Sequence, residues 1–266
     1  MTSFIDSRGI TISSVKIPKN DIKRLRTNGL TARIAKDITL TSGKQITSTL
    51  KPNPYNGGKG QWTIDIKATA VGKTTLKAKA GAKEATLDIE VFAKKIIQLP
   101  EKNTEQGLLA RLFIAESVNP SSPRYKEVDA STSMLWMRQV IENRKADNNP
   151  SRFAISTNTN VTYKDVITAR NQFHGFEGYP TSLIESISNN LSLIMTIANN
   201  YNHPERETYS NFVTAALNAA KANALAKFTD PTSNGLYGWR TKGSSEPGGD
   251  FVKHANLAGQ TFYTLK

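Results

Sequence analysis

Residues 108–120 read LLARLFIAESVNP, an apolar run that carries one carboxylate, Glu116, just before the pattern breaks at Asn119 and Pro120. Apolar residues recur at helical spacing, so the run predicts a core helix over residues 105–117 with Glu116 in its last turn. The carbonyl end of a helix is partially negative and apolar neighbours desolvate a carboxylate, and both effects favour the protonated form. The pattern therefore predicts a general acid, or else an ordinary helix-end glutamate that is solvated or paired with an arginine.

The composition excludes several classes of protein. Of the 266 residues 38% are hydrophobic, and no apolar run approaches the roughly 20 residues that a membrane helix needs, so we expect no membrane insertion. The absence of cysteine excludes a disulfide scaffold, a thiolate zinc site and a cysteine nucleophile. No H-E-x-x-H, G-x-S-x-G, Walker or G-x-G-x-x-G motif is present, so the sequence predicts no metal and no cofactor.

The pattern of polar and apolar residues changes near residue 98. Before it, polar and apolar residues alternate, as in WTIDIKATAV (62–71), with turn signals that include those at 53–58. About seven short strands of this kind predict an all-β, immunoglobulin-like sandwich over residues 1–97. Helical periodicity then dominates and predicts a mainly α domain over residues 98–266. Its further helices are expected over residues 131–145, 162–170, 181–201 and 205–228.

Positive charge is concentrated in the first half of the chain. Residues 1–96 hold 18 Lys and Arg against 7 Asp and Glu, whereas residues 97–266 hold 17 against 15. By charge alone, such a basic module is suited to nucleic acid, to anionic envelope polymers or to an acidic partner surface. Few aromatic residues lie between the lysines, so the stacking platform of a single-strand binder is missing and we expect no nucleic-acid partner. Alternatively, these lysines lie on a polar face of a sheet that contacts solvent and binds no partner.

Six segments of the second half carry a more specific signal. They are IAES (114–117), VIENRK (140–145), DVIT (165–168), QFHGFEGYP (172–180), DPTSNGLYGW (230–239) and HANLAGQTFYTL (254–265). In this order they resemble the SleB-type cell-wall hydrolases (spore-cortex-lytic enzymes), which implies a lysozyme-like domain that cleaves peptidoglycan. The strand-rich run from Trp62 to Val91 likewise resembles the bacterial Ig-like modules of surface and secreted proteins.

The resemblance implies roles for individual residues. Glu116 falls on the catalytic acid of the family, Asn143 and Arg144 on its N-R pair, and Gln172 and Phe173 on its Q-F pair.

The sequence also departs from the family pattern. SVN (117–119) replaces A-R-G, and the second acid of that motif is absent. Glu127 and Asp129, which lie in an insertion, are candidates for the missing carboxylate. Glu177 is a third candidate, with a solvated surface glutamate as the alternative.

A glycosidic bond between N-acetylmuramic acid and N-acetylglucosamine needs an acid that protonates the leaving oxygen, and Glu116 would be that acid. With a single carboxyl the family resemblance implies lytic transglycosylase chemistry, in which the 6-hydroxyl of the muramic acid closes a 1,6-anhydro ring. A second carboxyl would instead allow a muramidase.

A sugar cleft also needs aromatic rings that stack on pyranose faces and amides that bind N-acetyl groups. The predicted substrate contacts are Gln172, Phe173, Phe176, Tyr179, Asn143, Tyr237 and Trp239. For the aromatic residues the alternative is packing in the core.

The predicted partner is peptidoglycan, bound by a monomer. The chain starts with MTSFIDSRGITISS, which is not a Sec signal peptide. This predicts a protein secreted by a signal-peptide-independent route, such as type VI secretion, that acts in the periplasm of a target cell. An antibacterial effector of this kind implies a secretion-apparatus carrier and an immunity protein as further partners. The alternative is a protein that binds glycan or the envelope without cleaving it.

Overall fold

The computed structural model describes residues 2–30, 37–52, 62–157 and 159–266. The chain divides into two compact units, Met1–Lys95 and Ile96–Lys266, and the sequence analysis placed the change of character between residues 97 and 98. Helix and strand each account for about 29% of these described residues, so the fold is mixed. The turns expected at 53–58 lie outside the described residues.

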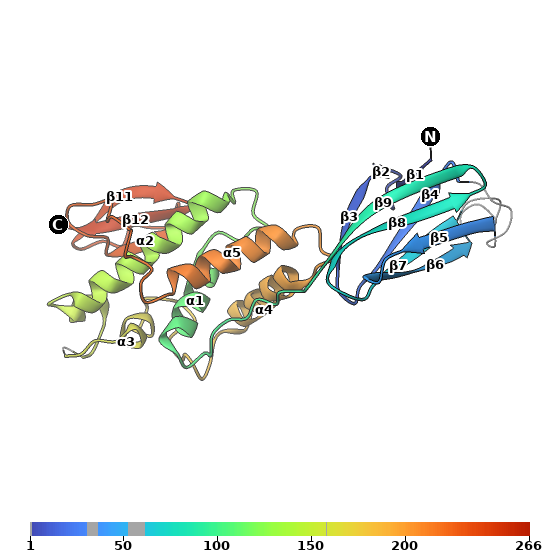
Figure 1. Ribbon diagram of the computed structural model, residues 1–266. Coiled ribbons are helices and arrows are strands. Elements are labelled where there is room, and N and C mark those ends of the chain that lie inside the picture. The colour runs from blue at the N-terminus through green and yellow to red at the C-terminus, as the bar shows by residue number, and fades with distance from the viewer. Residues whose placement is uncertain (1, 31–36, 53–61, 158) are drawn as a thin grey trace. The chain divides into compact units, whose positions relative to one another are not determined.

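The first unit consists of strands in two sheets (Figure 1). The strands are β1 (Ser3–Ile5), β2 (Thr11–Ile12), β3 (Ser14–Pro18), β4 (Ile22–Asn28), β5 (Ile38–Ser42), β6 (Ile46–Pro52), β7 (Trp62–Ala68), β8 (Gly72–Ala80) and β9 (Lys83–Phe92). One sheet has the order β2-β1-β4-β7-β6 and the other β3-β9-β8-β5. Most pairs are antiparallel, whereas β3 pairs with β9 in parallel.

The two sheets of the first unit share one apolar core. It takes Ile64 and Ile66 from β7 and Leu87, Ile89 and Val91 from β9, all at alternate positions along their strands. Because successive side chains of a strand point to opposite faces, the residues between them face outward. The alternation seen in the sequence is therefore the alternation between core and solvent.

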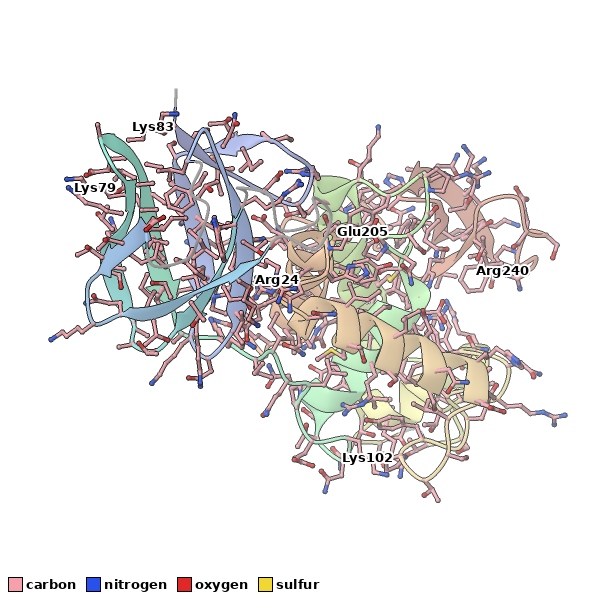
Figure 2. The ribbon with its side chains drawn as sticks, turned by 90° about the vertical axis from the view of Figure 1, so that its right-hand side faces the viewer. Arg24, Lys79, Lys83, Lys102, Glu205 and Arg240 are labelled. Atoms are coloured by element: carbon pink, nitrogen blue, oxygen red, sulfur yellow. The ribbon has the colours of Figure 1, made fainter. Side chains whose placement is uncertain are left out.

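The outward positions carry the positive charge of this unit. Figure 2 shows Arg24 on β4, and Lys79 and Lys83 on the β8–β9 hairpin. Asp65 on the five-stranded sheet forms ion pairs with Arg24, 2.6 Å away, and with Lys51, 2.8 Å away. The hydrogen bond from Arg24, followed by the contact with Lys51, holds the pKa of Asp65 well below its usual range.

The second unit contains helices and a small sheet (Figure 1). Its elements are α1 (Glu105–Glu116), α2 (Glu127–Ala146), the 3-10 turn η3 (Pro150–Phe153), α3 (Tyr163–Ile167), α4 (Glu185–Asn199), α5 (Arg206–Ala219), β10 (Gly238–Thr241), β11 (Phe251–Leu257) and β12 (Gln260–Leu265). The helix expected over 205–228 ends at Ala219, because the chain beyond it continues in tight turns in which Ala224 donates to the Lys221 carbonyl. Helix α2 starts four residues before the expected 131.

Helix α5 lies at the centre of the second unit, alongside α1, α2 and α4 (Figure 1). It contributes Phe212, Val213 and Ala216 to the core, each with no exposed surface. Leu112 and Phe113 of α1 are equally buried. The apolar run within residues 108–120 therefore forms part of the core of this unit.

Strands β10, β12 and β11 form an antiparallel sheet beside α2, which helical periodicity did not predict. The β11–β12 turn consists of Ala258 (φ 47°) and Gly259 (φ 73°). Two successive residues with positive φ are typical of the type I′ turn, whose twist matches that of the paired strands. The turn brings Gln260 to α1, where its Nε2 donates to the Glu116 carbonyl over 2.6 Å.

Candidate active site

Glu116 is the last residue of α1, and its carboxyl is desolvated. The residue is half-buried, and its Oε2 accepts a hydrogen bond from Trp239 Nε1 over 3.2 Å. Desolvation raises the pKa of Glu116, while the Trp239 hydrogen bond and the charge of His174 act in the opposite direction more weakly. The carboxyl therefore holds its proton to a higher pH than a solvated glutamate does, which a general acid needs.

Trp239 reaches Glu116 from β10 and rests on Phe173. The two ring centroids are 5.0 Å apart, and Phe173 itself is 4% exposed. The structure thus corrects the role expected of Phe173, because a ring covered by Trp239 and Arg144 supports the site and offers no free face to a sugar.

Helix α2 holds the segment that leads into β10. Asn143 Nδ2 donates to the Leu236 carbonyl over 2.8 Å, and Arg144 Nε donates to the Tyr237 carbonyl over 2.7 Å. Gln139 donates to Asn143 Oδ1, also over 2.8 Å. Asn143 was expected to bind substrate, but both ends of its amide are occupied inside the protein. It is a positioning residue for β10 and Trp239.

Gln172 is oriented by the same helix. Its Oε1 accepts a hydrogen bond from Arg144 Nη1 over 2.9 Å. This contact directs the amide so that Nε2 is the end left without a partner among the described residues. Gln172 lines a pocket and is half-buried, so its free donors are available to a carbonyl oxygen such as that of an N-acetyl group.

The pocket beside Trp239 has a volume of 530 Å³. The polar side chains that line it are Arg144, Arg152, Asn171, Gln172, His174, Glu177, Trp239, Arg240 and Tyr263. Figure 2 shows Arg240 on the C-terminal sheet. Glu116 itself does not line this pocket, but Trp239 lines it and donates a hydrogen bond to the Glu116 carboxyl.

Several residues that line this pocket were not predicted from the sequence to be functional. His174 lies within the QFHGFEGYP segment but matched no metal-binding or catalytic spacing. Arg152 and Arg240 are separated by 88 positions and belong to no motif. Only the folding of η3 and β10 beside α2 brings them to one pocket.

Three expected substrate contacts are packed in the protein. Phe176 has no exposed surface. The Tyr179 hydroxyl donates to the Lys102 carbonyl, and the ring is 5% exposed. Tyr237 stacks on Phe153 with ring centroids 5.9 Å apart and an interplanar angle of 8°. The alternative of core packing therefore holds for Phe176 and Tyr179, whose rings are buried. Tyr237 is half-buried, with one face of its ring stacked on Phe153.

Glu127 and Asp129 are not brought to Glu116. They lie in the first turn of α2, and Glu127 Oε2 accepts a hydrogen bond from Asn211 of α5 over 3.2 Å. The α1 end contacts α2 at Met137, where Ser117 Oγ is 3.9 Å from the sulfur. Ten residues of helix separate Glu127 from Met137, or about 15 Å along the axis. Neither acid is placed to act with Glu116.

Glu177 is the one candidate second carboxylate that lies in the pocket. It is exposed, and its Oε2 accepts a hydrogen bond from the Gly175 amide over 2.8 Å. Gly175 has a φ of 87°, and a Cβ there would lie 2.6 Å from the Ile184 side chain. The loop therefore requires glycine at this position in order to present His174 and Glu177.

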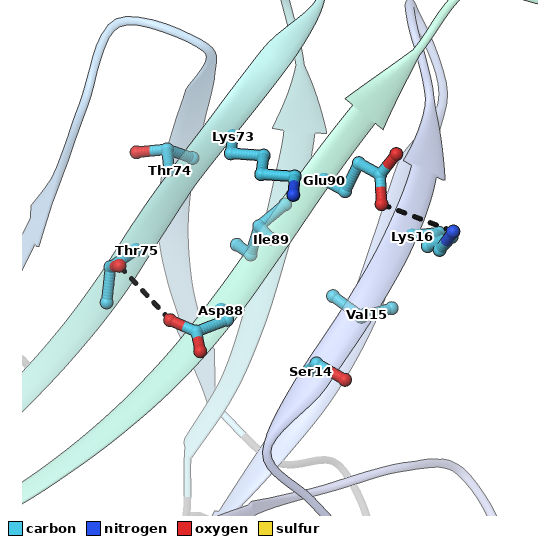
Figure 3. Close-up of a pocket in the computed structure, with 9 residues that line it drawn as sticks. All are labelled: Ser14, Val15, Lys16, Lys73, Thr74, Thr75, Asp88, Ile89 and Glu90. Atoms are coloured by element: carbon cyan, nitrogen blue, oxygen red, sulfur yellow. Dashed lines mark hydrogen bonds and ion pairs between the residues drawn. The ribbon is translucent and has the colours of Figure 1, made fainter.

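A second hollow, of 440 Å³, lies on the outer face of the four-stranded sheet in the first unit (Figure 3). Two of its charged residues pair with each other, and a third accepts a hydrogen bond from a threonine. Lys16 contacts Glu90 over 3.2 Å, and Thr75 donates to Asp88 over 3.2 Å. These contacts are those of a solvated sheet face, and no buried polar group points into the hollow among the described residues.

Among the residues that the structure describes, no helix is both long and apolar enough to cross a membrane. In the same part of the chain, no group of three or more His, Cys, Asp or Glu side chains is placed to hold a metal ion.

Comparison with known proteins does not identify a family. No family model matches the chain, and no curated protein is similar to it. Among solved structures, domains 4 and 5 of the S-layer protein SbsC share 24% identity over 30% of this chain and 48% of that one, with a TM-score of 0.25. The chain thus spans less than half of that structure.

Two other solved structures are similar at the same low level. The cysteine protease inhibitor EhICP2 from Entamoeba histolytica shares 17% identity over 30% of this chain and 86% of its own, with a TM-score of 0.22. The M1 domain from titin shares 9% identity over 37% of this chain and 97% of its own, with a TM-score of 0.20. The function must therefore be argued from the site itself.

Proposed function

We propose that the second unit cleaves the glycan strands of peptidoglycan, with Glu116 as the general acid. The observation that carries the proposal is the Glu116 carboxyl, which is desolvated at the end of α1 and accepts a hydrogen bond from Trp239, a residue that lines a polar pocket. The ordered resemblance of six segments to SleB-type hydrolases supports the same reading, and Glu116 is the residue that falls on the acid of that family.

The chemistry uses one carboxyl. Protonated Glu116 gives its proton to the glycosidic oxygen as the bond to the leaving sugar breaks. The ionised carboxylate then removes a proton from the 6-hydroxyl of the muramic acid, whose oxygen closes the 1,6-anhydro ring. Glu116 thereby ends in its protonated form. Glu127 and Asp129 lie away from Glu116, which favours this transglycosylase course over a muramidase that uses either of them. Glu177 in the pocket is exposed and accepts a hydrogen bond from the Gly175 amide, so a muramidase course would have to use this residue.

The proposal also includes the fold type of each unit. The second unit is a lysozyme-like domain in which α1 presents the acid, and the first unit is an Ig-like sandwich. With its surplus of positive charge, the sandwich docks on an anionic envelope polymer or on the carrier that exports the protein. The protein acts as an antibacterial effector in the periplasm of a target cell, and its producer makes an immunity protein that blocks Glu116.

The direct test replaces Glu116 with glutamine, which keeps the shape and removes the transferable proton. Loss of a general acid typically costs about 100-fold or more in rate, so Glu116→Gln should no longer clear a suspension of purified sacculi. The matched control is Glu207→Gln, an exposed glutamate in the first turn of α5, which should clear it at the wild-type rate. Full activity of Glu116→Gln would sink the assignment.

Mass spectrometry of the digest identifies the bond. Strands that end in 1,6-anhydromuramic acid support the transglycosylase, whereas reducing ends show that water completes the reaction. Freed peptides with intact glycan would overturn the glycosidase proposal altogether. Co-sedimentation without any product would leave a non-catalytic envelope-binding protein.

The site of action can be tested in cells. The full chain expressed in the cytoplasm should be harmless, and the same chain behind a Sec signal should cause lysis, because only the periplasm contains the substrate. Killing from the cytoplasm would indicate an intracellular substrate instead.

A further inference from the structure

Two arginines of α2 are both buried, yet only one has a counter-ion. Arg138 is 2% exposed and is bonded to Glu142 over 2.6 Å and to the Tyr163 hydroxyl over 2.8 Å. Arg144, six residues later, is 6% exposed and has no carboxylate partner among the described residues. A buried charge without a partner is costly, so its persistence suggests that a ligand supplies the anion.

The hydrogen bonds of Arg144 do not replace an anion. They go to two neutral acceptors, the Tyr237 carbonyl and Gln172 Oε1. Within the described chain, Nη2 makes no hydrogen bond, although Arg144 lines the pocket. Desolvation lowers the pKa of Arg144 to about 9, so the guanidinium stays charged at neutral pH.

The rest of the pocket has the same sign of charge. Arg152 and Arg240 also line it, and Glu177 is the only carboxylate that does so among the described residues. Arg152 is also paired with Asp147, which does not line the pocket, over 4.0 Å. Three guanidinium groups against these two carboxylates still leave an excess of positive charge. Arginine binds carboxylates through two parallel N–H donors, so a carboxylate fits this lining better than a neutral hydroxyl does.

Trp239 lines the pocket and donates a hydrogen bond to the Glu116 carboxyl, so one side chain lies between the pocket and the candidate acid. A glycan strand extends over many sugars, so a strand cleaved at Glu116 can also place a charged group in the pocket. We infer that the pocket formed by Arg144, Arg152 and Arg240 is a carboxylate subsite that recognises the acidic groups carried by the glycan strand. This inference rests on the proposed function and adds a substrate class to it, namely glycan with free carboxylates close to the scissile bond.

Peptidoglycan offers two sources of such a carboxylate. Peptide-bearing strands carry it on the stem peptide, and strands from which the peptides have been removed carry it on the lactyl group of the muramic acid. Treatment of either kind of strand with a carbodiimide and ammonia converts its carboxylates into neutral amides of nearly the same size. The four preparations therefore separate charge from shape, and one source from the other.

The experiment measures binding of soluble strands to the full chain in the Glu116→Gln background, so that no substrate is consumed. We expect amidation of the strands to weaken binding about tenfold, since a charge-assisted contact is lost. Arg240→Gln and Arg152→Gln should each weaken binding of untreated strands to a similar extent and should add little once the strands are amidated. Glu177→Gln should leave binding unchanged or strengthen it.

The control is Arg124→Gln, an exposed arginine of the same unit that does not line the pocket. It should bind untreated strands as the parent does, which excludes a general effect of net charge. Tighter binding of peptide-bearing strands identifies the stem peptide as the source, and tighter binding of peptide-free strands identifies the lactyl group.

Equal affinity for untreated and amidated strands, or equal losses for Arg124→Gln and Arg240→Gln, would overturn the carboxylate subsite. Because the readout is binding, it is independent of cleavage. Failure of the wild-type protein to release products would count against the proposed function and not against the subsite.

Discussion

At the scale of the residue, Glu116 is subject to opposing effects. Burial raises the pKa of Glu116, and the Trp239 hydrogen bond and the charge of His174 lower it again in part. An acid at the end of α1 is useful only if the first effect is the larger, because the group must still be protonated when it meets its substrate.

The variant Trp239→Phe tests how far the Trp239 hydrogen bond lowers the pKa of Glu116. The variant keeps an aromatic ring on Phe173 but loses the N–H that favours the ionised carboxylate, so the pKa of Glu116 should rise further. Since Glu116 acts in its protonated form, the alkaline limb of the pH–rate profile should move to higher pH. The control is Trp136→Phe, whose indole contacts Phe262 rather than Glu116. A limb that stays in place, or moves down, would contradict the assignment.

At the scale of the element, α2 acts as a support for β10. Asn143 and Arg144 both hold the segment that runs into this strand, at Leu236 and Tyr237. Gly235, in the same segment, has a φ of 81°, and a Cβ there would lie 3.0 Å from Asn143 Nδ2. The close approach explains why glycine precedes the strand.

Asn143→Ala tests this support. Loss of the donor to the Leu236 carbonyl should lower the free energy of unfolding by about 1–2 kcal/mol, measured by chemical denaturation. It should also lower kcat more than it raises KM, because Asn143 positions Trp239 and does not bind substrate. Asn189→Ala, an exposed position on α4, is the control and should change neither quantity.

At the scale of the whole molecule, the chain contains two separate cores. One belongs to the strands of the first unit and the other to the helices and the small sheet of the second. Unfolding should therefore show two thermal transitions in calorimetry, one for each unit.

Glu116 should affect only one of these transitions. Burial raises the pKa of Glu116 in the folded state above its value in the unfolded state. Protonation of Glu116 therefore stabilises the second unit, and this stabilisation is complete at pH values below the unfolded-state pKa. The stabilisation is lost as the pH rises through the folded-state pKa. The transition of the second unit should thus fall over that window in the wild type and should fall less in Glu116→Gln. A shift of the first-unit transition in Glu116→Gln would show that the two units do not unfold independently.

The sequence by itself determined the parts of this protein that depend on local periodicity. Alternation predicted the strands of the first unit, and helical spacing predicted α1 with Glu116 at its end, because both signals arise from neighbours a few residues apart. Helix ends were less certain, since tight turns such as those after Ala219 preserve much of the helical spacing.

Only the tertiary structure decided how the site is assembled. Trp239 reaches Glu116 across 123 positions of the chain, and Arg144 meets Tyr237 across 93. It also decided that Phe176 and Tyr179 belong to the core, a choice that aromatic composition leaves open because the same ring suits a sugar or an apolar interior. The physical reason is that burial and pairing depend on which elements pack together, and no window of the sequence contains both partners.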